Sequence, residues 1–199
     1  MLFVARAYAE TGVQPPVDLQ FAFVSDEETG GDAGLAAVLD VSQFSPDGCI
    51  IGETTSRAGR CSVTVADRGS IWLTLEAEGT AAHGSRPMLG KNAIDRLYEA
   101  VESLRTRLAN CPLSIDSEMQ KIVEESVGYY APEAGTEATE TLFAYPSVNL
   151  GVLEGGDAVN TVPASARAEI DIRVTASVET RDVLEAIREC IDDCAGVEI

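Results

Sequence analysis

The stretch Val24-Ser25-Asp26-Glu27-Glu28-Thr29-Gly30-Gly31 follows an apolar run that starts at Val17 and precedes a short helical pattern. Three consecutive carboxylates at the end of a buried strand are costly to desolvate unless a cation lies among them. Open α/β sheets place their chemistry at the carboxyl ends of their strands. The stretch is therefore a candidate site. A solvated acidic turn that caps the next helix is the alternative.

A second acidic strand end supports an α/β fold class for the first part of the chain. A buried strand is predicted at residues 49–52, and it is followed by Glu53. Helices are predicted over residues 1–10 and 33–39, and a first strand over residues 17–25. The order helix, strand, helix, strand indicates part of a parallel αβα sheet, with acids at the carboxyl ends of both strands.

The pattern changes near residue 59 to alternating, antiparallel strands. From residue 69 on, the predicted order is β-α-β-β-α-β, a ferredoxin-like α+β sandwich. Its strands are expected at residues 70–77, 147–153, 166–174 and from 196, and its helices at 92–108 and 178–194. Residues 110–146 are expected to be irregular, with a polar, mobile insertion at 131–141. The sequence thus predicts domains at residues 1–58 and 59–199.

Composition excludes several classes of partner. The net charge is −19, from 33 acids against 14 bases. Nucleic acids and anionic membranes are poor partners for such a surface. No apolar run approaches the roughly 20 residues of a membrane helix. An acidic surface poor in lysine over an ordinary apolar core suggests a halophilic source, and a strongly acidic protein of a mesophile is the alternative.

The five cysteines are odd in number and form no CxxC pattern, so neither a disulfide framework nor a zinc ribbon is indicated. Cys190 and Cys194 have the spacing of a metal pair on a helix, but without further ligands nearby packing is the preferred interpretation. A reducing cytoplasm fits this usage. Residues 1–10 lack the pattern of a signal peptide and form a helix without a cap, so we expect further chain before Met1.

The acids could perform metal-assisted hydrolysis. Glu27 and Glu28 are adjacent on a segment predicted to be extended, so their side chains should point in opposite directions. One of them could bind a metal while its neighbour faces a substrate water. Glu53 could bring another carboxylate to the same crevice. Such carboxylates suit zinc if histidines complete the coordination shell, or manganese or magnesium otherwise. Two unrelated acidic turns are the alternative.

Five short motifs occur in order along the chain: Asp26-Glu27-Glu28-Thr29-Gly30, Gly52-Glu53-Thr54-Thr55, Gly79-Thr80-Ala81-Ala82-His83-Gly84-Ser85-Arg86-Pro87, Asn160-Thr161-Val162-Pro163 and Asp171-Ile172-Arg173. Together they resemble the dizinc aminoacylase and carboxypeptidase G family, which includes acetylornithine deacetylase and succinyl-diaminopimelate desuccinylase. The resemblance implies a catalytic α/β domain with a pair of zinc ions, cobalt or manganese being the alternatives. It also implies an inserted ferredoxin-like lid that forms the homodimer.

The resemblance assigns roles to individual residues. It implies that Glu27 is the general base and acid, which takes a proton from the zinc-bridging water and delivers it to the leaving amine. Glu28 and Glu53 would each bind one zinc ion. His83, from the partner subunit's lid, would donate a hydrogen bond to the oxyanion of the tetrahedral intermediate. A loop histidine that is hydrogen-bonded to backbone is the alternative interpretation of His83.

Asn160 and Arg173 match lid positions that hold the substrate, and the planar guanidinium of Arg173 suits a carboxylate. The alternative for Arg173 is a surface ion pair with Asp171 or Glu169. The implied substrate is an N-acyl amino acid or a short peptide. Glutamate rather than aspartate at position 53 favours the deacylases within the family.

Several metal ligands of the family have no match in this chain. The first metal-binding histidine and the bridging aspartate would precede Met1, and the last histidine would follow Ile199. His83 is the only histidine, and it matches the lid. We therefore expect this chain to be the central part of such an enzyme, to bind no zinc tightly, and to be inactive alone. A dimerisation or binding module without activity is the second hypothesis.

Overall fold

The computed structural model describes residues 1–29, 31–41, 46–53, 59, 62–176 and 178–199. It separates into two units, residues 1–63 and residues 64–199, and each is described by itself. The boundary predicted between residues 58 and 59 touches residues outside the described part and stays a prediction.

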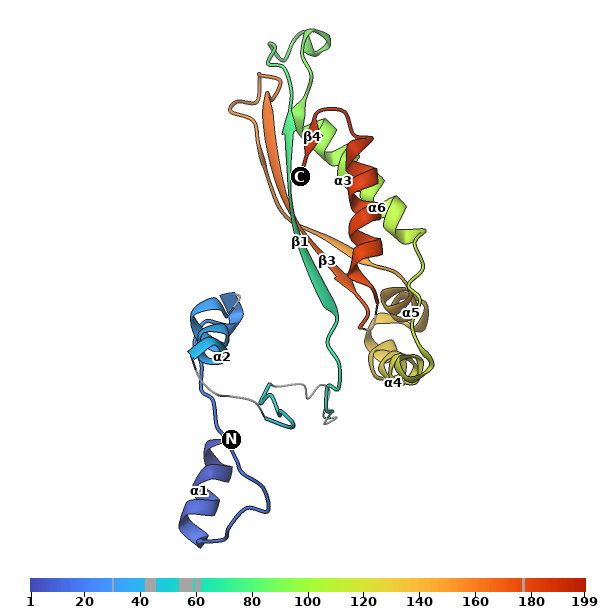
Figure 1. Ribbon diagram of the computed structural model, residues 1–199. Helices are drawn as coiled ribbons and strands as arrows, with labels where there is room; N and C mark the ends of the chain where they lie inside the picture. The colour runs from blue at the N-terminus through green and yellow to red at the C-terminus, as the bar shows by residue number, and fades with distance from the viewer. Residues whose placement is uncertain (30, 42–45, 54–58, 60–61, 177) are drawn as a thin grey trace. The chain divides into compact units, whose positions relative to one another are not determined.

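The second unit is built on a four-stranded antiparallel sheet (Figure 1). Its strands are β1 (Gly69–Glu78), β2 (Ser147–Gly155), β3 (Ser165–Val174) and β4 (Val197–Glu198), in the order β2-β3-β1-β4. β1 and β3 pair without a break from Gly69 opposite Val174 to Glu78 opposite Ser165. The α+β class expected for this part of the chain is confirmed, and the four strands and the two long helices that were predicted occur in the predicted order.

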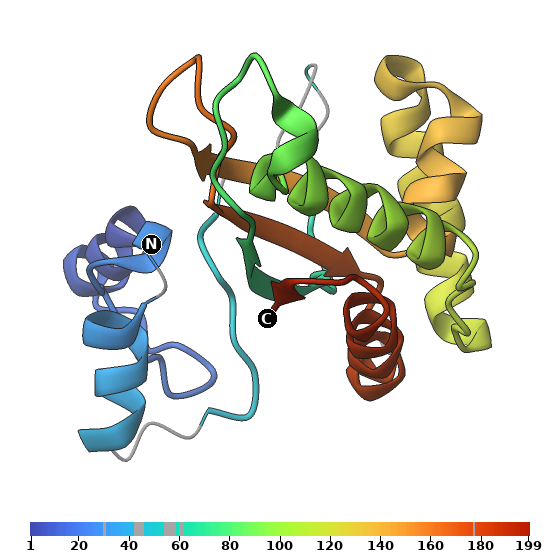
Figure 2. The ribbon, with the colours of Figure 1, turned by 90° about the horizontal axis from the view of Figure 1, so that it is seen from above.

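Two helices, α3 (Ala93–Ala109) and α6 (Thr180–Asp192), cover one face of the sheet (Figure 2). Alternate β3 residues face these helices and are buried, as the period of a strand requires. They pack against a buried stripe on α3, formed by Ala93, Leu97, Ala100, Val101, Leu104 and Leu108. Asn92 caps α3 by accepting hydrogen bonds from the backbone N–H groups of Ile94 and Asp95, at 2.9 and 3.3 Å.

The expectation of an irregular segment between residues 110 and 146 was wrong. It forms two helices that pack against each other, α4 (Ser117–Ala134) and α5 (Thr136–Ala144). Asp116 caps α4 by accepting hydrogen bonds from the N–H groups of Glu118 and Met119, at 2.9 and 2.8 Å. Gly135, at φ 86°, separates the two helices with a backbone conformation that favours glycine. This N-cap and glycine were the sequence signals of a helical hairpin.

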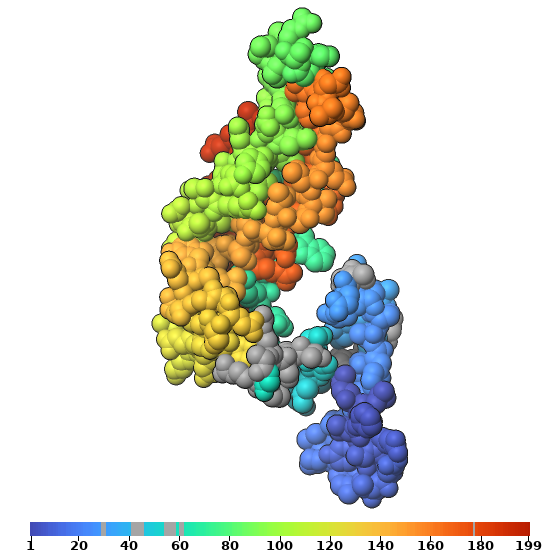
Figure 3. Space-filling view, turned by 180° about the vertical axis from the view of Figure 1, so that it is seen from behind, coloured from blue at the N-terminus to red at the C-terminus, as the bar shows by residue number. Residues whose placement is uncertain are grey.

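Two loops lie together at one end of the second unit. One, residues 79–92, follows β1, and the other, residues 156–164, precedes β3. The paired ends of β1 and β3 make the loops start side by side. In the space-filling view the first loop (green) and the second (orange) adjoin at the top (Figure 3).

The first unit contains α1 (Leu2–Thr11), a 3₁₀ turn (Glu27–Thr29), a π-helical turn (Asp32–Ala36) and α2 (Ala37–Val41). The segments predicted as parallel strands, residues 17–25 and 49–52, are not strands. A strand exists only through hydrogen bonds to a neighbour, and the described residues of this unit contain no strand that could pair with them. The parallel sheet is therefore not formed by the described residues.

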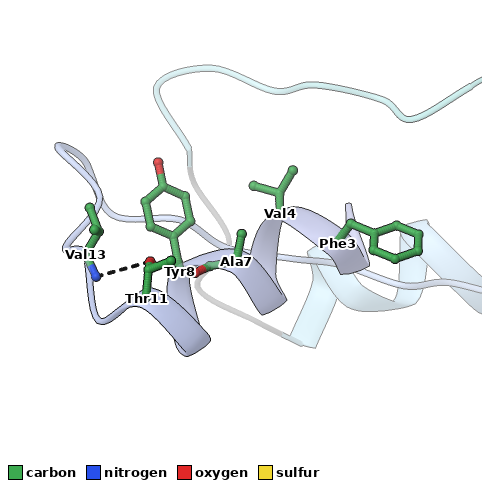
Figure 4. A pocket seen from close by; sticks show the side chains of 6 residues that line it. All are labelled: Phe3, Val4, Ala7, Tyr8, Thr11 and Val13. Atoms are coloured by element: carbon green, nitrogen blue, oxygen red, sulfur yellow. Dashed lines mark hydrogen bonds between the residues drawn. The ribbon is translucent and has the colours of Figure 1, made fainter.

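Among the residues of the first unit whose burial the structure describes, only Gly34 is buried, so these residues form no apolar core. α1 instead presents an open apolar hollow of about 380 Å³ (Figure 4). Its lining residues are Phe3, Val4, Ala7, Tyr8, Thr11 and Val13. The Thr11 hydroxyl donates to the carbonyl of Ala7 at 2.7 Å and closes the helix. None of the helices in the described part of the chain has the length and apolar character needed to cross a membrane.

Candidate active site

The two loops at the end of β1 and β3 hold His83 beside Asn160. The backbone N–H of Val162 donates to the carbonyl of Ala82 at 2.8 Å, and the N–H of Gly84 donates to the carbonyl of Asn160 at 2.7 Å. Between these bonds, His83 and Thr161 form an antiparallel bridge. The residues on either side of His83, Ala82 and Gly84, are therefore each hydrogen-bonded through the backbone to the opposite loop.

Gly84 favours this close approach because it has no side chain. A Cβ atom at position 84 would lie 3.0 Å from the carbonyl carbon and oxygen of Asn160, which are backbone atoms that cannot rotate away. Next to the contact is an open hollow of about 560 Å³. It is lined by Gly84, Asn92, Ile94, Gly155, Gly156, Asp157, Ala158, Val159, Thr161, Val162 and Pro163. His83 is not among these residues, and the hollow adjoins it only through its neighbour Gly84 and its bridge partner Thr161.

His83 is exposed, and its ring has a defined hydrogen-bond partner. Nδ1 lies 2.8 Å from the hydroxyl of Ser85 and 3.2 Å from the backbone nitrogen of Ser85, whose N–H donates to it. Nδ1 thus makes the backbone hydrogen bond that the alternative interpretation of His83 describes. No bond of Nε2 is found in the part of the chain that the structure describes.

Arg173 lies at the opposite end of the sheet. It pairs with Ser70 in β1, eight residues before Glu78, the last residue of that strand. At about 3.3 Å per residue, this places Arg173 roughly 26 Å from the loop end of the sheet. Nε of Arg173 donates to both carboxylate oxygens of Asp171, at 2.8 and 2.9 Å. The structure brings His83 and Asn160 together and separates Arg173 from both.

Arg68 is a charged neighbour of Arg173 that the sequence reasoning missed. It donates from Nη2 to the carbonyl of Arg173 at 2.8 Å and from Nη1 to the hydroxyl of Ser147 at 3.1 Å. Burial, and then the charge of Arg173, lower the pKa of the Arg68 guanidinium, while Asp171 opposes this shift. The only sequence signal was an arginine immediately before a strand.

Glu27 and Glu28 are exposed, and the expectation of an extended segment was wrong. They lie in the 3₁₀ turn, where successive side chains are about 120° apart rather than opposite. The reason is the preceding residue. Asp26 has a left-handed backbone, with φ 57°, and its Oδ2 accepts a hydrogen bond from the N–H of Ala33 at 2.9 Å. Asp26 therefore makes the local cap that the alternative interpretation describes.

The described carboxylates do not form a metal site. Glu53 is exposed, and the residues that follow it in its motif, Thr54 and Thr55, lie outside the described residues. Within the described ranges no group of three or more histidine, cysteine, aspartate or glutamate side chains could hold a metal ion. Glu28 and Glu53 offer carboxylates without an imidazole, and this donor set does not fit a zinc ion.

Cys190 and Cys194 pack against the core of the second unit. The thiol of Cys194 donates to the carbonyl of Cys190 at 3.2 Å. Burial raises the pKa of both thiols, which disfavours the thiolate that a metal or a redox reaction needs. This favours the packing interpretation of the pair.

Comparisons with known proteins match both units. The family model described as the M20 peptidase dimerisation domain matches residues 65–196. A probable carboxypeptidase of Neosartorya fischeri is 32% identical, the match covering 89% of this chain and 36% of that protein. One of Aspergillus niger is 33% identical, with 85% and 36% covered. The chain spans about a third of the length of these curated relatives.

Two solved structures match part of the chain. An M20 family metallo-carboxypeptidase from Sulfolobus solfataricus matches with a TM-score of 0.49 at 16% identity, covering 66% of this chain and 37% of that one. An aminobenzoyl-glutamate utilization protein from Klebsiella pneumoniae matches with a TM-score of 0.42 at 19% identity, covering 66% and 27%.

Zinc titration of this chain tests the incomplete donor set. We expect no stoichiometric, tight binding in calorimetry, because two carboxylates without imidazole hold zinc weakly. A Glu28→Gln variant serves as the matched control and should give the same weak heat. Tight binding of one or more equivalents that is lost in Glu28→Gln would contradict our interpretation of the site.

Proposed function

The chain belongs to the M20 peptidase family, whose dimerisation domain it contains, and on that premise we propose that it is the lid and part of the catalytic domain of a metal-dependent hydrolase. The complete protein would hydrolyse the amide of a short peptide at its carboxyl end. The names of the fungal relatives support this substrate class. An N-acyl amino acid is the second candidate, favoured by glutamate at position 53.

The observation that carries the proposal is the pair of backbone hydrogen bonds that hold His83 beside Asn160. An oxyanion is stabilised by donors fixed in advance, so that no reorganisation is needed when charge develops. His83 would donate from Nε2 to the oxyanion of the tetrahedral intermediate. The side-chain amide of Asn160 would hold the substrate next to it.

Arg173 would serve the same substrate from a second copy of the chain. A dipeptide spans about 7 Å, whereas Arg173 lies roughly 26 Å from the loop end of its own sheet. A single lid therefore cannot place both groups on one substrate. A two-fold dimer whose lids pair antiparallel would bring the loop end of one lid to the Arg173 end of the other, so each site would combine residues of two subunits.

The dimer would form along β2. This nine-residue strand is an edge of the sheet that the described residues form, and the backbone groups on its outer side are a template for a second β2. Leu153 on this strand is 44% exposed. Ile94 of α3 lies close to Gly155, and Tyr98, one turn further along that helix, is 55% exposed. The strand edge and this side of α3 would make one apolar interface.

The remaining roles follow the chemistry of each group. Glu27 would take a proton from the attacking water and deliver it to the leaving amine. Arg173 would hold the substrate carboxylate, with Asp171 fixing the orientation of its guanidinium. Glu28 and Glu53 would be metal ligands in the complete protein. These two carboxylates do not by themselves fit a zinc ion, so no step of the reaction is assigned to a metal.

Substitution of Glu27 tests the proposed reaction in the complete protein. Glu27→Gln removes the proton acceptor and keeps the shape, so we expect kcat for a short peptide to fall roughly a thousandfold. Glu10→Gln, an exposed acid on α1, is the control and should be neutral. The measurement is steady-state hydrolysis of a dipeptide and an N-acetyl amino acid. If Glu27→Gln keeps full activity, the assigned role is wrong.

Charge placed on the β2 edge tests the dimer. Leu153→Asp and Tyr98→Glu each put a carboxylate into the proposed interface, so we expect dissociation to monomers. Size-exclusion chromatography with light scattering gives the mass. Glu118→Lys on α4 is the control and should remain dimeric. A wild-type chain that is strictly monomeric at high concentration would contradict the proposed lid.

A further inference from the structure

Ser85 lies in a turn that folds it back onto the ring of His83. The backbone N–H of Arg86 donates to the carbonyl of His83 at 2.8 Å, which closes a β-turn over residues 83–86. Within this turn both the N–H and the hydroxyl of Ser85 approach Nδ1, at 3.2 and 2.8 Å. Two groups of one residue therefore meet a single ring nitrogen.

These contacts determine where the imidazole proton resides. A backbone N–H is always a donor, so Nδ1 must be the acceptor in its bond with Ser85. A ring nitrogen that accepts carries no proton, and in the neutral ring the single proton is then on Nε2. With Nδ1 accepting from this N–H, the Ser85 hydroxyl, 2.8 Å away, can act only as a second donor to the same lone pair. The hydrogen bonds thus assign the Nε2–H tautomer to His83.

We propose that Ser85 is a positioning residue that keeps His83 as the Nε2–H tautomer. The proposal rests on the proposed function. In the Nε2–H tautomer, Nε2 is always a donor for the oxyanion, because the other tautomer would present a lone pair at Nε2. Ser85 touches neither substrate nor the reacting atoms in this proposal. It acts only through the proton position of His83.

The turn itself does not depend on the Ser85 hydroxyl. Its closing bond joins backbone atoms of His83 and Arg86, and Gly84 is bonded to Asn160 through backbone atoms as well. Removing the hydroxyl should therefore leave the turn and the loop contact in place. A change in the His83 ring after this substitution would report on the tautomer and not on the fold.

Because the chain has a single histidine, nitrogen NMR of the imidazole gives one unambiguous ring. At about pH 9, where an ordinary histidine is neutral, we expect Nε2 to have the shift of a protonated nitrogen and Nδ1 that of an unprotonated one. Ser85→Ala removes one of two donors to Nδ1, so the ratio of Nε2–H to Nδ1–H should fall about fivefold. Ser85→Thr keeps a hydroxyl and should restore the wild-type spectrum.

Ser70→Ala on β1 is the matched control and should leave the ring shifts unchanged. The amide of Gly84 should stay protected from hydrogen exchange in every variant, which shows that the loop contact persists. A wild-type ring that is mainly Nδ1–H would overturn the proposal. So would a Ser85→Ala spectrum identical to that of the wild type with Gly84 still protected.

This readout needs no enzymatic activity, so it separates the tautomer from the proposed reaction. In the complete protein, kcat of Ser85→Ala should fall in proportion to the fraction of His83 rings that keep the proton on Nε2, with KM unchanged, since only the donor for the transition state is affected, and Ser85→Thr should restore kcat. A changed tautomer with unchanged kcat would support Ser85 as the positioning residue and contradict the oxyanion role of His83. An unchanged tautomer would contradict the proposal for Ser85 itself.

Discussion

The ten-residue pairing of β1 with β3 is the constraint on which the second unit depends. Its register, from Gly69 opposite Val174 to Glu78 opposite Ser165, aligns the alternating apolar side chains toward α3 and α6. The same register makes the loops after β1 and before β3 start side by side. A slip by one residue would turn every buried side chain outward and separate the loop contacts around His83. Core and site therefore share one constraint.

The register also underlies the proposal of a second subunit. It places Arg173 at the far end of the sheet from His83 and Asn160, so residues that resemble parts of one site lie at opposite ends of one lid. The sequence motifs identify His83, Asn160 and Arg173, but they do not reveal the distance between Arg173 and the other two residues. The strand positions that face each other are set by pairing between segments that are far apart in the chain. The spacing of residues along the sequence does not encode this pairing.

Prediction from the sequence succeeded where a local period carried the signal. The alternation of β1 and β3 and the apolar stripe of α3 identified the antiparallel layer. It failed for α4 and α5, because the Asp116 cap and Gly135 were overlooked in an acidic segment. It also failed for the parallel strands, because a strand needs neighbours that the described residues do not supply. The 3₁₀ turn at Glu27 arises from the left-handed Asp26, a conformation that composition does not indicate.

The claim that each site combines two subunits can be tested most directly by mixing inactive variants of the complete protein. His83→Ala and Arg173→Ala should each abolish activity as homodimers. In a heterodimer, one site would receive the intact Arg173 of one subunit and the intact His83 of the other. An exchanged equimolar mixture should then recover about a quarter of the wild-type activity, since half of the dimers are mixed and each has one intact site. A mixture that stays inactive after confirmed subunit exchange would contradict the account.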